Sequence, residues 1–595
     1  MEFVERQQKA ADCLAQDKYD EAIVLYDQCI EANSQVWSNY WKLGLALLLS
    51  GQKEEAQACW LSAIVEREYA EIEGGMVEII KFLENEGIER LESGKYEQSE
   101  IIFLELIELD PDNSKAYKNL GNAVFSQGKL EEAVAYYQKG LSLEGDADAT
   151  TYYNLGMVFH QQGKLEEAIA CFEKFLLLNP NSADALNNLG NSFQRLGKFD
   201  EGIACFQKAL TLEPNNALIL NNLGTAFQTV GKLEEALACY QKALSLEPND
   251  AMAHSNLGVF FMEQHQFEKA MACYNKALEI DPDYVDFHRN RAGLLLRLGD
   301  YKRGFAEYEW RWRRKENPPP SFPQPLWDGS DLDGKTILLY AEQGFGDTIQ
   351  FIRYAPLVRE RGGRVIFVSQ VPLVELLTTV AGIDKVVAVG TTLPQFDVRA
   401  PLLSLPYILG TTLETIPVQI PYISPLKSLS FKLETPDAAC FRVGLVWAGN
   451  PENADDRNRS CSLKYFAPLL SIAGIAFYSL QKGSKVEEIT QLSYQESIQD
   501  LSIQLNDFAD TAAVVAHLDL IITVDTAVAH LAGALGRPVW VVLSYSPDWR
   551  WMVEREDSPW YPTMRLFRQN QPGNWQDVLE RVAVALTELV NSKKS

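Results

Sequence analysis

The first half of the chain repeats the tripeptide Asn-Leu-Gly at an almost constant interval. Twelve residues after each glycine stands a small residue, and four residues further stands an aromatic one. The glycines follow one another at intervals of 35, 34, 34 and 34 residues, at Gly121, Gly156, Gly190, Gly224 and Gly258. Such a period predicts stacked pairs of antiparallel helices, because small residues let two backbones approach and the aromatic ring fills the remaining space.

This pattern resembles the signature of the tetratricopeptide repeat (TPR). Weaker copies of it lie at residues 17–30, 41–60 and 289–312. We therefore expect about nine repeats, which would form an α-solenoid, a TPR superhelix, over residues 1–315.

An asparagine stands immediately before the leucine of each signature, on the helix expected to line the concave groove. The five are Asn119, Asn154, Asn188, Asn222 and Asn256. A row of amides can hold an extended peptide backbone whatever its sequence, because each amide carries donors and an acceptor. Hydrogen bonds to neighbouring helices are the alternative use. The row resembles the asparagine ladder of the eukaryotic O-linked N-acetylglucosamine transferase, which implies a groove that recruits an acceptor protein or peptide.

Charge and hydropathy exclude several kinds of partner. The formal net charge is −27 and the sequence pI is about 4.8, whereas nucleic acids and anionic membranes bind clustered Lys and Arg. No run of about 18 apolar residues is present that could span a membrane. The first 20 residues are acidic and carry no apolar core run, so we expect no signal peptide and a cytoplasmic protein.

A change in the sequence pattern marks the expected domain border. A proline-rich tract begins the predicted linker, residues 316–334, and a proline-rich tract cannot be helical. From residue 335 onward, short β-rich runs alternate with amphipathic stretches, which is typical of parallel α/β units. We expect two such units, at 335–435 and 436–595.

The first α/β unit opens with a strand at 336–341, the loop 342–347 and a helix from Thr348 to Val358. Gly344 and Gly346 in this loop would let backbone amides approach a ligand at the helix N-terminus. The loop is neither a dinucleotide fingerprint, which would need glycine at Ile349, nor a phosphate-binding P-loop. Capping of the helix is the ordinary explanation of Asp347.

The second α/β unit carries two arginines ahead of a predicted helix. A strand at 442–447 runs into Asn450, and Arg457 and Arg459 lie in the predicted loop before a helix near Ser462. Guanidinium groups beside a helix N-terminus form an anion clamp, and a solvated surface loop is the alternative. The next strand, 477–480, ends at Gln481 and Lys482.

The segment 519–543 carries the clearest strand-to-helix turn. A buried strand at 520–524 leads through Asp525 and Thr526 into a helix that begins at Ala527, and a second strand follows at 539–543. Ligands of open α/β sheets bind at such carboxyl ends of strands. His530 is either part of this site or a packed imidazole.

The run 524–536 resembles the donor-site motif of the lipopolysaccharide heptosyltransferases, glycosyltransferase family 9. The loop 344–347 matches the glycine-aspartate loop of the same family, whose aspartate is taken as the catalytic base, here Asp347. The resemblance implies a GT-B fold of two Rossmann-like lobes, with the acceptor on the N-terminal lobe and a nucleotide sugar on the C-terminal one. We expect the donor to contact Gly344, Gly346, Asn450, Arg457, Arg459, Gln481, Lys482, Asp525, Thr526, Ala527 and His530.

Two departures leave the sugar, hexosyl or heptosyl, and the acceptor open. Ala527 replaces the usual glycine, and the segment 546–551 is unlike the heptosyltransferase ending. The only DxD-like triplet after the repeats, 331–333, lies in a turn ahead of the first strand, so we expect no metal and no cofactor besides the nucleotide-sugar co-substrate.

The sequence thus predicts an inverting, metal-independent glycosyltransferase that acts on a protein or glycan. In this mechanism Asp347 deprotonates the acceptor hydroxyl, while helix amides, Arg457, Arg459 and Lys482 stabilise the leaving diphosphate. The main alternative is a TPR scaffold with a catalytically inactive glycosyltransferase-like domain. A sugar-nucleotide epimerase is a third hypothesis, but it accounts for neither the repeats nor the asparagines.

Overall fold

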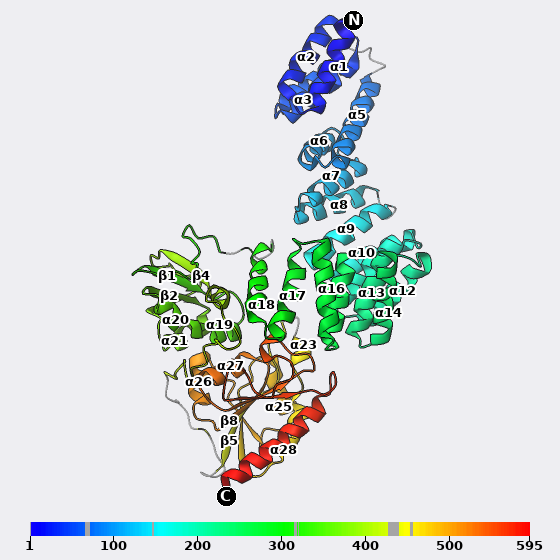
Figure 1. Cartoon of the computed structure of the whole chain (residues 1–595). Helices are drawn as coiled ribbons and strands as arrows, with labels where there is room; N and C mark the ends of the chain where they lie inside the picture. Colours follow the sequence, from blue (N-terminus) through cyan, green and yellow to red (C-terminus); the bar gives the residue numbers. More distant parts are fainter. Residues whose placement is uncertain are drawn as a thin grey trace. The chain divides into compact units, whose positions relative to one another are not determined.

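The structure is a computed structural model that describes residues 2–65, 72–144, 148–314, 318, 320–426, 433, 440–452 and 456–594. The chain divides into two compact units, Met1–Pro248 and Asn249–Ser595 (Figure 1). Each unit is described by itself below.

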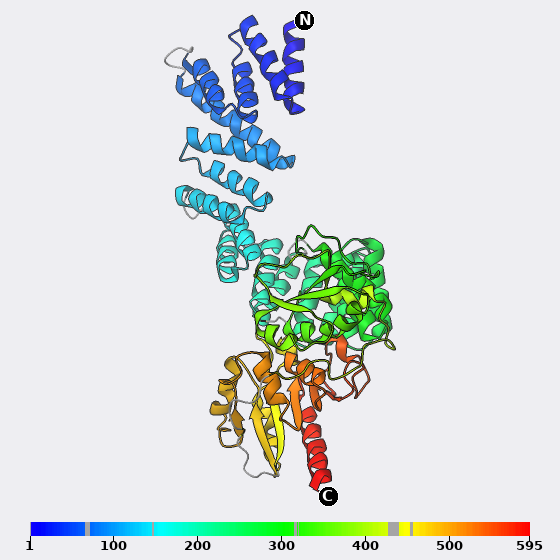
Figure 2. The same cartoon turned by 90° about the vertical axis from the view of Figure 1, so that its left-hand side faces the viewer.

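The first unit is built from antiparallel helix pairs, which Figure 2 shows stacked one after another. In chain order they are α1 (Glu2–Ala15), α2 (Tyr19–Ala32), α3 (Trp37–Leu49), α4 (Lys53–Val65), α5 (Ile72–Glu92), α6 (Tyr96–Leu109), α7 (Ser114–Ser126), α8 (Leu130–Glu144), α9 (Ala149–Gln162), α10 (Leu165–Leu178), α11 (Ala183–Arg195), α12 (Phe199–Leu212), α13 (Ala217–Thr229) and α14 (Leu233–Leu246).

The signature glycines and aromatics pack as the repeat pattern predicts. A Cβ atom on Gly156 would lie 2.8 Å from the ring of Phe172, and one on Gly190 would lie 2.7 Å from the ring of Phe206. Because both rings are fully buried, only glycine lets the two helices of a pair approach so closely. The first unit is therefore a helical TPR solenoid.

The second unit begins with two further helix pairs. They are α15 (Ala251–Glu263), α16 (Phe267–Ile280), α17 (Val285–Arg297) and α18 (Tyr301–Tyr308), and the 3-10 helix η2 (Glu309–Arg313) follows. Tyr301 and Phe305 of α18 share a hydrophobic cluster with Ile337 and Phe351 from the α/β region. This shared core explains why the compact unit begins at Asn249 and not near residue 315. The four-domain division remains a prediction.

The first α/β half holds a four-stranded parallel sheet in the order β3-β2-β1-β4. Its strands are β1 (Thr336–Tyr340), β2 (Arg364–Ser369), β3 (Lys385–Ala388) and β4 (Val398–Pro401). Its helices are α19 (Phe345–Phe351), η3 (Ile352–Tyr354), α20 (Ala355–Arg359), η4 (Val371–Leu373), α21 (Val374–Leu377), η5 (Leu402–Ser404) and α22 (Leu405–Ile408).

The second half holds a six-stranded parallel sheet in the order β10-β9-β8-β5-β6-β7. Its strands are β5 (Phe441–Val446), β6 (Ile475–Ser479), β7 (Ile498–Asp500), β8 (Leu520–Val524), β9 (Val539–Leu543) and β10 (Met564–Arg568). Its helices are α23 (Asp456–Arg459), η6 (Leu463–Phe466), α24 (Ala467–Leu470), η7 (Ser484–Glu487), α25 (Glu488–Gln491), α26 (Phe508–Val515), α27 (Ala527–Ala534), η8 (Trp549–Trp551) and α28 (Trp575–Lys594).

The predicted strands of the α/β region are present to within two residues, but two local predictions were wrong. The helix predicted from Thr348 begins at Phe345, so Asp347 lies inside its first turn. Arg457 and Arg459 lie in the short helix α23 and not in a loop. Part of the predicted linker pairs with the first sheet, because Trp327 N donates to Arg399 O at 2.8 Å. Residues 315–317 and 319 of that linker lie outside the described residues.

Strand order reverses at the same place in both sheets. Strand β1 lies between β2 and β4, and β5 lies between β6 and β8. In open parallel sheets the loops at the carboxyl ends of such neighbouring strands bind ligands. The loops after β1, β5 and β8 carry most of the predicted site residues.

Candidate functional site

Two helix N-termini meet at the carboxyl ends of β1 and β8. Helix α19 packs against α27 (Figure 1). A Cβ atom on Gly346 would lie 2.9 Å from Cδ2 of His530 and 3.6 Å from the Cα atom of Ala527. Glycine at 346 is therefore required for this approach, and the structure brings the two motifs predicted from the sequence into contact.

Asp347 is held by hydrogen bonds to both carboxylate oxygens. Gly344 N donates to Oδ2 at 2.9 Å, as a helix cap would, and Nη2 of Arg550 donates to Oδ1. The side chain keeps 19% of its surface exposed. Burial raises the pKa of Asp347 above its usual value, and the charge of Arg550 opposes that rise. A raised pKa makes the carboxylate a better proton acceptor near neutral pH.

Arg550 is a site residue that sequence reasoning missed. Its backbone N and its Nη1 donate to Asp548 Oδ1, both at 2.9 Å, and its Nε donates to Gln350 Oε1 at 2.7 Å. Arg550 is 9% exposed and lies between two carboxylates. In the sequence, Ser546–Trp551 differed from the heptosyltransferase ending, and nothing local linked it to a loop 203 residues away.

Asp525 and Thr526 form the turn into α27, as predicted. Burial raises the pKa of Asp525, and the neighbouring charge of Asp548 raises it further. The Thr526 hydroxyl lies 2.9 Å from that of Thr523 and does not cap the helix, which begins at Ala527. The first turn of α27 thus presents its amide end close to Gly346, and a helix N-terminus is a position where anions bind.

His530 is a packed imidazole. It is 4% exposed, its Nδ1 lies 3.1 Å from the Tyr561 hydroxyl, and its ring stacks on Trp551 at 5.3 Å. Burial, aided by the charge of Arg550, lowers the pKa of His530 to about 3. The packing interpretation is therefore the better one, and direct donor contact by His530 remains a prediction.

This pKa shift predicts a specific pH dependence of stability. The unfolded chain binds a proton at His530 near its ordinary pKa of 6.5, but the folded chain does so only near 3. Folding stability should therefore fall as the pH falls from about 6.5 toward 3. We expect His530→Asn to have a shallower dependence in that window, measured by unfolding temperature against pH. Parallel curves for the two proteins would contradict the assignment.

Arg459 is held at the carboxyl end of β5. Its Nε donates to Asp456 Oδ1 at 3.4 Å, and a Cβ atom on Gly449 would lie 3.3 Å from its guanidinium. Burial raises the pKa of Asp347 and of Asp525, and the positive charge of Arg459 opposes the rise at both carboxyls. The Arg459 side chain is 27% exposed. The side chain of Arg457 lies outside the described residues.

Three further residues that were predicted to contact the nucleotide-sugar donor form hydrogen bonds within the protein. Gln481, 2% exposed, accepts from Trp447 N at 3.0 Å and Ala448 N at 2.9 Å, which fixes the loop after β5. Lys482 Nζ donates to Ser502 O at 2.7 Å. The exposed Asn450 accepts from a backbone amide two residues on. Contact between these side chains and a donor remains a prediction.

Glu342, the other carboxylate of the loop after β1, is bound in an ion pair. Arg311 donates to its two oxygens at 2.9 and 3.1 Å, and Leu403 N donates to it at 3.0 Å. Its side chain is only 8% exposed. Glu342 therefore stabilises the join between η2 and the first sheet and is a poorer candidate base than Asp347.

The five asparagines of the repeats are half-buried, and three of them bond to the preceding repeat. Nδ2 of Asn154 donates to Asn122 Oδ1 at 2.8 Å, and Nδ2 of Asn188 donates to the Tyr153 hydroxyl at 2.8 Å. Asn222 donates to Asn187 Oδ1 at 2.9 Å. Hydrogen bonding between helices, the alternative from the sequence, is thus one use of the row.

Two kinds of feature, a metal-binding cluster and a membrane-spanning helix, are absent from the described residues. No group of three or more His, Cys, Asp or Glu side chains in this part of the chain is arranged to hold a metal ion. Among the described helices, none has the length and apolar character needed to cross a membrane.

Models of known protein families match residues in both the repeat region and the α/β region. Tetratricopeptide-repeat models match residues 112–176, 156–197, 181–247, 251–284 and 273–304. The model of glycosyltransferase family 9 (heptosyltransferase) matches residues 483–574, which include Asp525 and Arg550 but not Asp347.

Individual proteins are similar over part of the chain. Protein FlbA of Caulobacter vibrioides is 30% identical over 330 residues, 51% of this chain and 55% of FlbA, so the chain spans about half the length of that relative. Among solved structures, YrrB, a TPR protein with an unusual peptide-binding site, is 30% identical over 31% of this chain and 95% of its own, with a TM-score of 0.27. MamA is 24% identical over 28% of this chain and 96% of its own, also with a TM-score of 0.27.

The fold and the family models define a helical repeat protein joined to a glycosyltransferase domain. In particular, the chain carries TPR repeats within residues 112–304 and a C-terminal glycosyltransferase family 9 domain at residues 483–574.

Proposed function

We propose that the chain is an inverting, metal-independent glycosyltransferase that moves a sugar from a nucleotide-diphosphate sugar to a protein or glycan. The observation that carries this proposal is the close approach of the first turn of α19, which holds Asp347, to the first turn of α27, with the positive charge of Arg459 acting on Asp347 and Asp525. A carboxylate of raised pKa and an anion-binding helix terminus are the two parts that such a transfer needs.

A GT-B architecture is part of the proposal. Counted along the chain, the strands of the second sheet follow the 3-2-1-4-5-6 order of Rossmann folds, and those of the first sheet follow 3-2-1-4. Two Rossmann-like lobes, 335–435 for the acceptor and 436–595 for the donor, would place the reacting atoms between α19 and α27. The repeats would recruit the acceptor, and we propose a cytoplasmic location.

The reaction follows from the positions of the charges. Asp347 removes the proton of an acceptor hydroxyl, whose oxygen attacks the anomeric carbon. The bond from that carbon to the diphosphate oxygen breaks, the configuration inverts, and the diphosphate leaves with the electron pair. The α27 amides and Arg459 stabilise the new charge, together with Arg457 and Lys482. No metal and no cofactor besides the nucleotide sugar takes part in this proposal.

Binding of a nucleotide sugar is the first test. Each nucleotide sugar of a panel is added to the full chain, and the unfolding temperature is measured. A donor present at a hundredfold its Kd should stabilise the folded state by about 2.7 kcal/mol. A panel without any stabilising member would count against a donor site.

The anion clamp predicts a loss of affinity when both arginines are removed. Converting Arg457 and Arg459 together to alanine should weaken donor binding by about 1.5–3 kcal/mol, since a hydrogen bond to a charged group is lost. Calorimetry with the donor found in the panel measures this. Arg565→Ala, which removes an exposed arginine paired with Glu556, is the matched control. Equal affinities of the double variant and the control would refute the clamp.

A further inference from the structure

The loop after β9 connects the last repeat helices to Asp347. It begins at Tyr545 and includes η8. It contacts the turn between α15 and α16 and the end of α17 at its beginning, α18 at its middle, and Asp347 near its end. All of these residues lie in the second compact unit. We call residues 545–551 the bridging loop.

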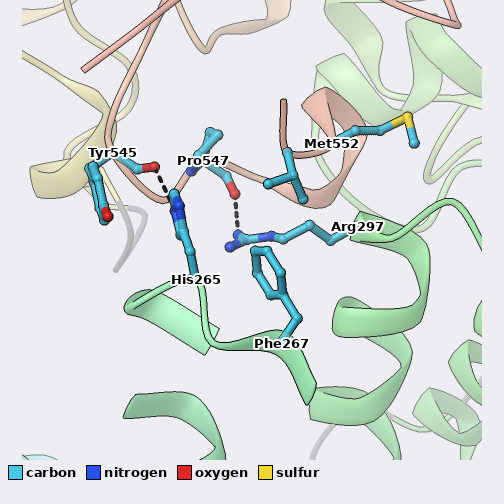
Figure 3. A pocket seen from close by; sticks show the side chains of 7 residues that line it. His265, Phe267, Arg297, Tyr545, Pro547 and Met552 are labelled. Atoms are coloured by element: carbon cyan, nitrogen blue, oxygen red, sulfur yellow. Dashed lines mark hydrogen bonds between the residues drawn. The ribbon is translucent and has the colours of Figure 1, made fainter. Parts of the chain in front are cut away.

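Arg297, the last residue of α17, fixes the beginning of the bridging loop. Its Nη1 donates to the Ser546 hydroxyl at 2.7 Å, and its Nη2 donates to Pro547 O. Figure 3 shows the Arg297 guanidinium directed at the Pro547 carbonyl, beside the His265 ring. That ring stacks on Tyr545 at 4.3 Å, and its Nε2 lies 3.1 Å from Tyr545 O.

The burial of Arg297 argues for a role in orientation. It is 7% exposed, and burial lowers its pKa. Its described hydrogen bonds go to a hydroxyl and a carbonyl and not to a carboxylate, so the desolvation of the cation is poorly offset. A planar guanidinium that binds two consecutive residues fixes the direction of the chain, which an apolar side chain of similar size would not do.

The middle of the bridging loop is anchored on α18. The ring of Trp549 packs edge-on against Phe305 at 5.7 Å and Tyr301 at 6.1 Å. Asp548 and Arg550 flank this tryptophan, and Arg550 reaches Asp347. Only three residues therefore lie between Ser546, which Arg297 contacts, and Arg550, whose guanidinium holds Asp347.

We propose that Arg297 is a positioning residue for Asp347, acting through the bridging loop and Arg550. The last repeat helices are then a part of the catalytic unit and not only a recruiting surface. The expected effect on catalysis rests on the proposed function, whereas the structural coupling between Arg297 and Asp347 does not.

Hydrogen exchange of the full-length protein tests the coupling without any substrate. In Arg297→Met, we expect amides of the bridging loop and the amide of Gly344, which Asp347 holds, to exchange roughly tenfold faster. Arg289→Met is the matched control, because Arg289 lies on the same helix, half exposed and paired with Asp286. Faster exchange confined to residues 265–267, Tyr545 and Ser546 would overturn the proposal.

Two further measurements complete the test. Arg297→Lys keeps one hydrogen-bond donor to the loop, so it should give an intermediate exchange rate. It replaces Arg297→Met in the exchange experiment if that variant does not fold. If the protein turns over a nucleotide sugar, the acid limb of the pH profile of kcat/KM should move to higher pH in Arg297→Met. The reason is that a less firmly held Arg550 opposes the burial-driven rise in the pKa of Asp347 less strongly. An acid limb at the same pH as in the wild type, with normal kcat, overturns the proposal. Absence of turnover in the wild type bears only on the proposed function.

Discussion

Replacing Asp347 by asparagine should lower turnover roughly 100-fold or more while donor affinity stays close to that of the wild type. The amide cannot accept the proton of an acceptor hydroxyl. Its oxygen can keep the cap on Gly344 N, but its NH2 group would then face the Arg550 guanidinium. Steady-state rates and donor affinity, measured on the same preparation, separate loss of the base from loss of binding.

A second carboxylate on Arg550 provides the control. Asp548→Asn removes a partner of the same guanidinium without removing the proposed base, so its expected loss is severalfold and not 100-fold. Near wild-type transfer by Asp347→Asn with normal donor affinity would refute the assignment. Attention would then move to Glu342, although Arg311 binds both of its oxygens.

Replacing Arg353 by methionine should destabilise the second unit by about 3–5 kcal/mol. Arg353 is 3% exposed and donates to the carbonyls of Gln350, Pro417 and Trp560 at 2.9, 3.1 and 2.6 Å. It therefore ties η3 of the first α/β half to the second half at Trp560. Its removal leaves several buried acceptors without their donor.

Denaturant unfolding followed by tryptophan fluorescence measures this loss, since nine of the 12 tryptophans lie after residue 248. Arg359→Met is the control, because its surface pair with Asp384 contributes at most about 1 kcal/mol. Equal midpoints for the two variants would show that Arg353 does not hold the two halves together.

Local patterns predicted the repeats and the parallel strands well. The period of 34 residues reports packing between neighbouring helices, and the buried strands β8 and β9 are continuous apolar runs with the predicted bounds. The turns after β1 and β8 were also predictable, because glycine or a capping residue must follow a strand that enters a helix. Asp525 entered the candidate site from its place in such a turn, whereas Asp347 entered it through the resemblance to glycosyltransferase family 9.

The rest depended on contacts between distant segments. Arg550 lies 203 residues from Asp347, and Arg353 lies 207 residues from Trp560, so no local pattern reports either contact. The uses of Gln481 and His530 were unpredictable for the same reason, because burial decides whether a polar side chain serves the fold or a ligand. The asparagines showed a pattern, but only the structure showed their bonds to the preceding repeats.

The most direct test of the account is release of nucleoside diphosphate by the full chain from a nucleotide sugar that it binds. We expect the wild type to release nucleoside diphosphate and Asp347→Asn not to release it. The sugar should then be found either attached to an acceptor or as the free sugar formed by hydrolysis. Tight donor binding without any release, identical in the two proteins and unchanged across a panel of acceptor proteins and glycans, would contradict the account and favour a scaffold protein with an inactive glycosyltransferase domain.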